Sequence, residues 1–83
     1  PVTVAGAGGE AVSVTDRGFV TAQPAVLEGR GVISWAGPWP VVEPTWDPTR
    51  ARRAHRFQLV DDRGAAWLAV LEGGAWHLEG RYA

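Results

Sequence analysis

Hydrophobic residues along this chain alternate with polar or small residues over short stretches, and Gly, Asp and Pro separate these stretches. Alternation with a period of two predicts β-strands, and the separating residues are typical of turns. No stretch spaces its apolar residues with the period of a helix. The pattern therefore predicts an all-β chain.

The clearest alternation lies in residues 53–82, where it predicts a three-stranded antiparallel meander. In its first strand, Phe57 and Leu59 alternate with Arg56 and Gln58. We therefore expect the two apolar side chains to face a core and the two polar ones to face solvent.

The rest of the meander contains two turns, at 61–64 and 72–74, around the stretch 65–71. This stretch is apolar at successive positions, which is typical of a central strand covered on both faces. Trp67 and Trp76 are expected in the core. Alternation in the last strand predicts one face with Trp76, Leu78 and Tyr82 and an opposite face with His77, Glu79 and Arg81.

The first half of the chain carries shorter signals. Alternation predicts a short strand at 2–4 and a hairpin over 11–21 with its turn at 16–18. Gly18 would accept a positive φ in that turn. Residues 25–35 are interpreted as strand, glycine-rich turn at 29–31, and strand.

Residues 36–48 contain four prolines, which lack the N–H that a sheet ladder needs. We expect a structured excursion here rather than a central strand. Its tryptophans, Trp39 and Trp46, could each be a lid over the core or an exposed anchor for a partner.

These elements add up to about six or seven short strands, and they predict a small, strongly bent antiparallel sheet or partly open barrel, SH3-like or OB-like. Residues 1–83 fit one small domain, because a chain of this size buries only about 60% of its unfolded surface. Since the first residue is Pro1, we expect a domain from the C-terminus of a longer protein.

Composition excludes several classes. The chain has no Cys, so it has neither a disulfide framework nor a thiolate metal site. It has no apolar run long enough for a membrane helix and no recognisable signal peptide. The sequence thus predicts a cytoplasmic domain with no membrane association.

Charge is unevenly distributed although the net charge is only −1. Half of the eight basic residues lie within 50–56, namely Arg50, Arg52, Arg53 and Arg56. Three interpretations remain open: a solvated segment that protects a strand edge, a contact for a protein partner, or a site for single-stranded DNA in which a base stacks on Trp46.

Catalytic chemistry finds little support in the sequence. The only adjacent carboxylates, Asp61 and Asp62, fall in a predicted turn. His55 and His77 fall on expected solvent-facing strand positions, and zinc would need further ligands that the sequence does not place nearby. We therefore expect no enzyme activity, no cofactor, no metal and no small-molecule substrate.

An ordered series of motifs carries a family resemblance over residues 12–82. It consists of WAGPWP at 35–40, WDP at 46–48, an arginine-rich run into RFQLV at 56–60, and LEGG at 71–74 before Trp76. The series resembles the C-terminal domain of actinobacterial ImuB-like proteins. These are Y-family DNA polymerase homologues without the catalytic carboxylates, and they act as adaptors in DNA-damage-induced translesion synthesis.

The resemblance implies a non-catalytic, nucleoid-associated docking domain. Its partners would be the RecA-like accessory protein ImuA, the error-prone C-family DNA polymerase, or both, with a possible weak contact to DNA. The family often has Asp, Arg and Trp where this chain has Val42, Pro44 and Thr45, and at the C-terminus it differs at Ala75, His77 and Ala83. The candidate partner-binding residues are Trp35, Trp39, Trp46, Arg50, Arg52, Arg53 and Arg56.

Overall fold

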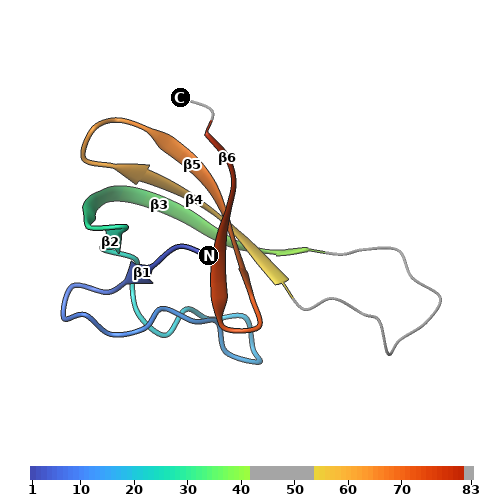
Figure 1. Ribbon diagram of the computed structural model, residues 1–83. Helices are drawn as coiled ribbons and strands as arrows, with labels where there is room; N and C mark the ends of the chain where they lie inside the picture. The colour runs from blue at the N-terminus through green and yellow to red at the C-terminus, as the bar shows by residue number, and fades with distance from the viewer. Residues whose placement is uncertain (42–53, 82–83) are drawn as a thin grey trace.

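The computed structural model describes residues 1–41 and 54–81, and it is all-β (Figure 1). Within the described residues there is no helix, and hence none that could cross a membrane. The strands pair antiparallel in the order of the sequence. They are β1 (Val4–Ala5), β2 (Val26–Leu27), β3 (Arg30–Val41), β4 (Ala54–Asp61), β5 (Ala66–Glu72) and β6 (Ala75–Arg81).

The four long strands, β3 to β6, form a strongly curled sheet, and the short β1 and β2 continue it along one edge (Figure 1). Beyond β1, the Val2 N–H donates to the Trp76 carbonyl at 2.8 Å, so the first residues meet β6. The two ends of the curled sheet therefore approach each other. This confirms the predicted small, partly open barrel.

The core fills the inside of the curl. Phe57 is its centre: its ring centroid lies 4.8 Å from that of Trp76 and 6.3 Å from that of Trp35. The expectation that Trp76 is a core residue is confirmed, whereas Trp67 is half-buried and packs against the core from its margin. The buried members of the cluster are Val4, Val12, Leu27, Phe57, Leu59, Ala69, Leu71 and Trp76.

The predicted turns are present, with one difference in the first hairpin. The β5–β6 turn places Gly73 and Gly74 at positive φ, as a two-residue hairpin turn requires. Gly18 also has a positive φ, of 84°, but the strands predicted around it reduce to a single bridge between Val14 and Val20. The segment 6–25 is therefore mostly loop.

The predicted excursion over 36–48 is wrong for its first six residues, which continue β3. Ala36 pairs with Gln58 and Trp39 with Arg56, so Gly37 and Pro38 form a bulge on β3. On the side of β3 away from β4, β2 pairs only with the first two residues of β3, Arg30 and Gly31, so the rest of that side is an open edge among the described residues. Proline is tolerated at a bulge and on an edge, which explains why β3 includes it. Residues 42–48 lie outside the described residues.

The predicted alternation in β6 is wrong beyond Leu78. Leu78 pairs with Ala69, but Gly80 pairs with Leu68, so a bulge inserts one extra residue. Because a bulge reverses the alternation, Arg81 pairs with Trp67 and joins the core-facing side of the sheet. Its guanidinium carbon lies 5.7 Å from the Trp67 ring centroid.

Candidate functional site

The outer face of the sheet, meaning the side of β3 to β6 that points away from the core, presents one row of directly opposed residues. The row runs from Trp39 on β3 through Arg56 and Val70 to His77 on β6. Trp39 keeps 48% of its surface exposed, whereas Val70 is buried. The row therefore ends on a large exposed indole at the sheet edge.

The bulge in β3 separates two residues that were predicted to share a site. Trp35 pairs with the buried Leu59, faces the core and packs near Phe57. Trp39 pairs with Arg56 and lies on the outer face. Without the extra residue, positions 35 and 39 would lie on the same face of the strand. The structure therefore brings together Trp39 and Arg56 and turns Trp35 inward.

Arg56 reaches from β4 across β5 to Glu79 on β6. Its Nε lies 2.7 Å from Glu79 Oε1 and its second nitrogen 3.3 Å from Oε2, which makes a two-point ion pair. Both side chains are more than a third exposed, so the pair adds at most about 1 kcal/mol of stability. Its main consequence is that the Arg56 charge is already matched by a carboxylate.

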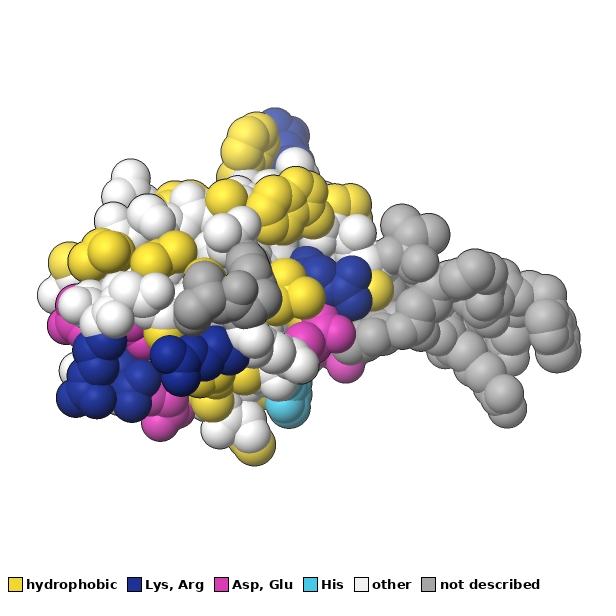
Figure 2. Space-filling view, turned by 90° about the horizontal axis from the view of Figure 1, so that it is seen from above, with side chains coloured by type: hydrophobic (Ala, Val, Ile, Leu, Met, Phe, Trp, Pro, Cys, Tyr) yellow, Lys and Arg dark blue, Asp and Glu magenta, His cyan; other side chains and the backbone are white. Residues whose placement is uncertain are grey.

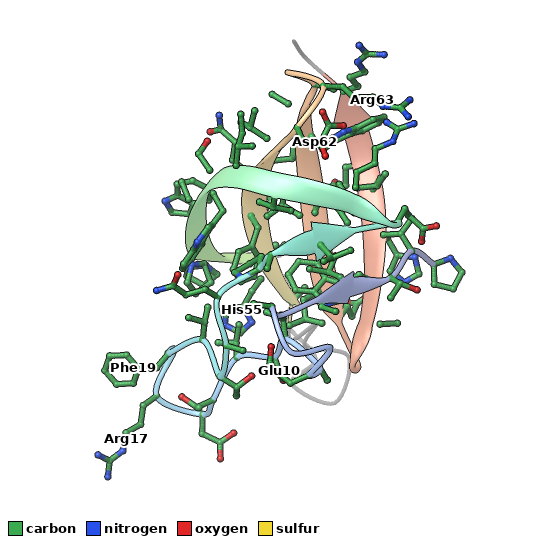
Figure 3. The ribbon with its side chains drawn as sticks, turned by 90° about the vertical axis from the view of Figure 1, so that its left-hand side faces the viewer. Glu10, Arg17, Phe19, His55, Asp62 and Arg63 are labelled. Carbon is green, nitrogen blue, oxygen red and sulfur yellow. The ribbon has the colours of Figure 1, made fainter. Side chains whose placement is uncertain are left out.

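The other candidate residues, Trp46, Arg50, Arg52 and Arg53, lie outside the described residues. Two other large apolar side chains are well exposed, Phe19 and Ile33. Phe19 projects from the turn that also carries Arg17, and both point away from the body of the domain (Figure 3). Neither belongs to the row that contains Trp39.

At the end of the barrel where β4 turns into β5, Asp61 is fully buried. Its Oδ1 accepts hydrogen bonds from the backbone N–H groups of Arg63 and Ala65, both at 2.9 Å. Its Oδ2 accepts from Trp67 Nε1 at 3.1 Å and from Arg30 at 3.3 Å. The prediction that Asp61 forms a turn is confirmed, but this carboxylate also connects three strands.

These donors favour the ionised carboxylate, and they lower the pKa of Asp61 from 3.8 to about 2. The hydrogen bond from Trp67 is the largest cause, the two backbone N–H groups and Arg30 add to it, and burial opposes it. A carboxylate held ionised and fully bonded does not act as a general acid or base near neutral pH. The site is structural.

Sequence reasoning missed a cluster of arginines at this same end of the barrel, Arg30, Arg63 and Arg81, and we call it the arginine end. Arg30 bonds to Asp61, Arg81 stands over Trp67, and Arg63 lies in the turn beside Asp62 (Figure 3). A dense group of dark-blue side chains is visible on the left of Figure 2. The three arginines are far apart in the chain, so no local charge run reveals them.

The histidines do not form a metal site in the part of the chain that is described. His77 is exposed as predicted, but His55 is half-buried and pairs with Pro40 and the core residue Leu71. The prediction that His55 faces solvent is therefore wrong, because His55 lies two residues before Phe57 on β4 and so shares its core-facing side. Within 1–41 and 54–81, no group of three His, Asp or Glu residues could hold a metal ion.

Comparison with family models, curated proteins and solved structures finds no match for this chain. The fold and the site define a small all-β open barrel with an exposed tryptophan on its outer face. The likeness to ImuB-like proteins rests on the sequence motifs alone.

Proposed function

We propose that this chain is a non-catalytic protein-interaction domain of a translesion DNA synthesis adaptor, and that it docks a partner through the outer face around Trp39. One observation carries the docking role: an indole with 48% of its surface exposed sits on the outer face of the sheet, next to an arginine. Tryptophan and arginine are the residues most enriched among those that dominate binding energy at protein interfaces.

The surroundings of Trp39 also favour a protein partner. The outer face near it offers the small or partly exposed apolar side chains of Ala36 and Val41, and Leu68 lies further across the same face on β5. A partner could bury these together with the indole, and apolar burial contributes about 25 cal/mol per Å². Arg56 is less suited to DNA, because Glu79 already pairs with its charge.

The docking mode supported here is a side-chain surface rather than strand addition. The open edge of β3 carries Pro38 and Pro40, and two register irregularities interrupt it, between Val32 and Ser34 and between Ala36 and Trp39. Prolines and bulges are the devices that protect sheet edges from pairing with another strand. The specific partners, ImuA and the error-prone C-family polymerase, follow from the motif resemblance.

Calorimetric titration of the domain with the RecA-like accessory protein tests the proposal. We expect saturable binding that Trp39→Ala weakens by about 2 kcal/mol, or roughly 30-fold in Kd. Ile33→Ala is the matched control, because it truncates another exposed apolar side chain on the same strand. It should leave Kd nearly unchanged.

The polymerase is titrated in the same way, since either protein could be the partner. Equal affinity of the wild-type and Trp39→Ala chains for both would contradict a docking role for this face. Titration with a single-stranded oligonucleotide tests the other function class. Binding that weakens steeply with salt would replace the proposed function with DNA binding.

A further inference from the structure

Two large apolar side chains, Phe19 and Ile33, are the most exposed of their kind in the described part of the chain, at 68% and 66%. Neither belongs to the Trp39 surface. Phe19 lies in the turn between Val14 and Val20, and its side chain points away from the body of the domain (Figure 3). Ile33 lies on β3 at a groove. A partner that removed both side chains from water would gain free energy from their burial.

The groove beside Ile33 has a volume of about 460 Å³ and lies between β3 and the residues that precede β2. Glu10 is the charged side chain of its lining, and it is exposed. Its Oε1 accepts the Gly8 N–H at 3.1 Å, but no cation among the described residues pairs with the carboxylate. The groove therefore suits an apolar side chain with a positive charge beside it. Its apolar wall consists of Ala22, Pro24, Ala25, Val32, Ile33 and Trp35.

The turn that carries Phe19 has the complementary chemistry. Arg17 projects from the same turn, and it has no ion-pair partner in the described part of the chain (Figure 3). Asp16, the other charged residue of the turn, lines a separate pocket against β3 and β4. Thr15 orders the turn, because its N–H donates to the Phe19 carbonyl at 2.7 Å and its Oγ1 accepts the Phe19 N–H at 3.1 Å. An ordered turn loses less conformational entropy when it binds.

We propose that two copies of this chain form a reciprocal dimer, in which Phe19 of each copy occupies the groove of the other and Arg17 pairs with Glu10. The turn and the groove are neighbours, since residues 22–25 of the groove follow Phe19 in the chain and Glu10 lies on the adjacent loop (Figure 3). A single twofold axis can therefore form both contacts in one interface.

A second copy fits this groove better than other occupants. The chain itself supplies an exposed aromatic ring and an unpaired cation for a groove with an unpaired carboxylate. Its net charge of −1 gives little repulsion between copies. A phosphate backbone would meet only the carboxylate of Glu10 among the charged groups of the lining. Trp39 takes no part in the contact, so the inference does not rest on the proposed function.

Sedimentation equilibrium of the chain tests for the dimer. We expect the weight-average mass to rise from 8.9 kDa toward twice that value between about 10 µM and about 1 mM, because a small interface gives a weak dimer. Phe19→Ala and Ile33→Ala should each weaken dimerisation at least tenfold. Trp39→Ala is the matched control, because it truncates an exposed apolar side chain outside the contact and should dimerise as the wild type does.

Charge reversal tests the pairing of Arg17 with Glu10. Arg17→Glu and Glu10→Arg each place like charges at both reciprocal contacts, so each alone should weaken dimerisation at least tenfold. An equimolar mixture of these two variants has opposite charges at both contacts and should dimerise nearly as the wild type does. A mixture of Glu10→Arg with Arg63→Glu has the same net charges but restores only one contact, so it should dimerise more weakly.

Retained dispersion of the β3 to β6 amide resonances shows that each variant is folded. Four results would overturn the inference: a mass that stays at 8.9 kDa up to about 1 mM, wild-type dimerisation of Phe19→Ala, no recovery in the mixture of Arg17→Glu with Glu10→Arg, or assemblies larger than two copies. None of these results involves Trp39 or a partner protein, so failure here leaves the proposed docking role standing.

Discussion

Asp61 is a carboxylate with no exposed surface whose two oxygens accept four hydrogen bonds, two from its own turn and two from side chains of other strands. Removing any one donor would leave part of this buried charge unsatisfied, which costs more than the net gain of an ordinary hydrogen bond. The residue therefore couples the β4–β5 turn to the arginine end of the barrel.

The lowered pKa of Asp61 makes the stability of the domain depend on pH. Its folded-state pKa of about 2 lies below the ordinary 3.8, so the unfolded chain takes up the proton first as pH falls. The contribution of Asp61 is complete above about pH 4 and is lost as pH falls through about pH 2. We expect the midpoint of urea unfolding, monitored by tryptophan fluorescence, to decrease as the pH is lowered from about 4 to about 2.

Asp61→Asn should have a lower urea midpoint at pH 7 and a smaller fall between about pH 4 and pH 2, because the amide cannot offer four acceptor sites or a negative charge. Asp16→Asn, in the distant turn around Gly18, controls for the change in net charge. An Asp61→Asn chain with the wild-type midpoint and slope would show that these hydrogen bonds contribute nothing to stability.

At the scale of elements, strands and turns could be predicted because their signals are local. The alternation of Phe57 and Leu59 with polar neighbours and the glycines at 73 and 74 are visible in the chain itself. Bulges could not be predicted in this way, because a bulge depends on which residue of the neighbouring strand lies opposite it. Gly37 lies so close to β4 that a Cβ there would be 2.9 Å from the Arg56 carbonyl oxygen. The sequence shows Gly-Pro but not this neighbour.

The bulges determine which side chains share a face of the sheet and therefore which residues can form a site. The bulge at Gly37 and Pro38 in β3 moves Trp39 to the face opposite Trp35, and the bulge in β6 moves Arg81 beside Trp67. Strict alternation would place Trp35 and Trp39 on the same face, and it does not reveal the arginine end. The exposure of Trp39 also lay beyond the sequence, since a tryptophan in a proline-rich stretch is compatible with a lid or an anchor.

Two glycines, Gly74 in the β5–β6 turn and Gly80 in β6, test the account of the turn, because replacement by alanine should change the free energy of unfolding differently at each. Gly74 has a φ of 78°, which an alanine adopts only with strain, so Gly74→Ala should destabilise the domain by about 1 kcal/mol. Gly80 lies in β6 at an ordinary φ with open space around it, and Gly80→Ala should be neutral or stabilise by about 0.5 kcal/mol. Urea unfolding measures both, and equal effects would contradict this account of the turn.

At the scale of the whole molecule, stability is expected to differ between the two parts of the chain. Strands β3 to β6 share long ladders, whereas the segment 6–25 has only isolated bridges, such as that between Val14 and Val20. Apolar side chains of this segment, Val12 above all, pack on the core, and a side-chain hydrogen bond adds to this contact, because Trp76 Nε1 donates to the buried Val12 carbonyl at 3.1 Å. Regions with few such contacts open at lower free energy than the rest of a fold.

Trp76→Phe should therefore loosen the segment 6–25 before it affects the sheet. The phenyl ring keeps part of the packing on Phe57, but the Val12 carbonyl loses its donor, at a cost of about 1–3 kcal/mol. In hydrogen exchange, the amides of Thr15 and Thr21, which bond across this segment, should lose protection first. Trp35→Phe is the matched control, because Trp35 also packs near Phe57 but donates no side-chain hydrogen bond to the described residues. If both variants left Thr15 and Thr21 equally protected, the segment would be held by its own bridges and its apolar packing on the core rather than by the Trp76 hydrogen bond.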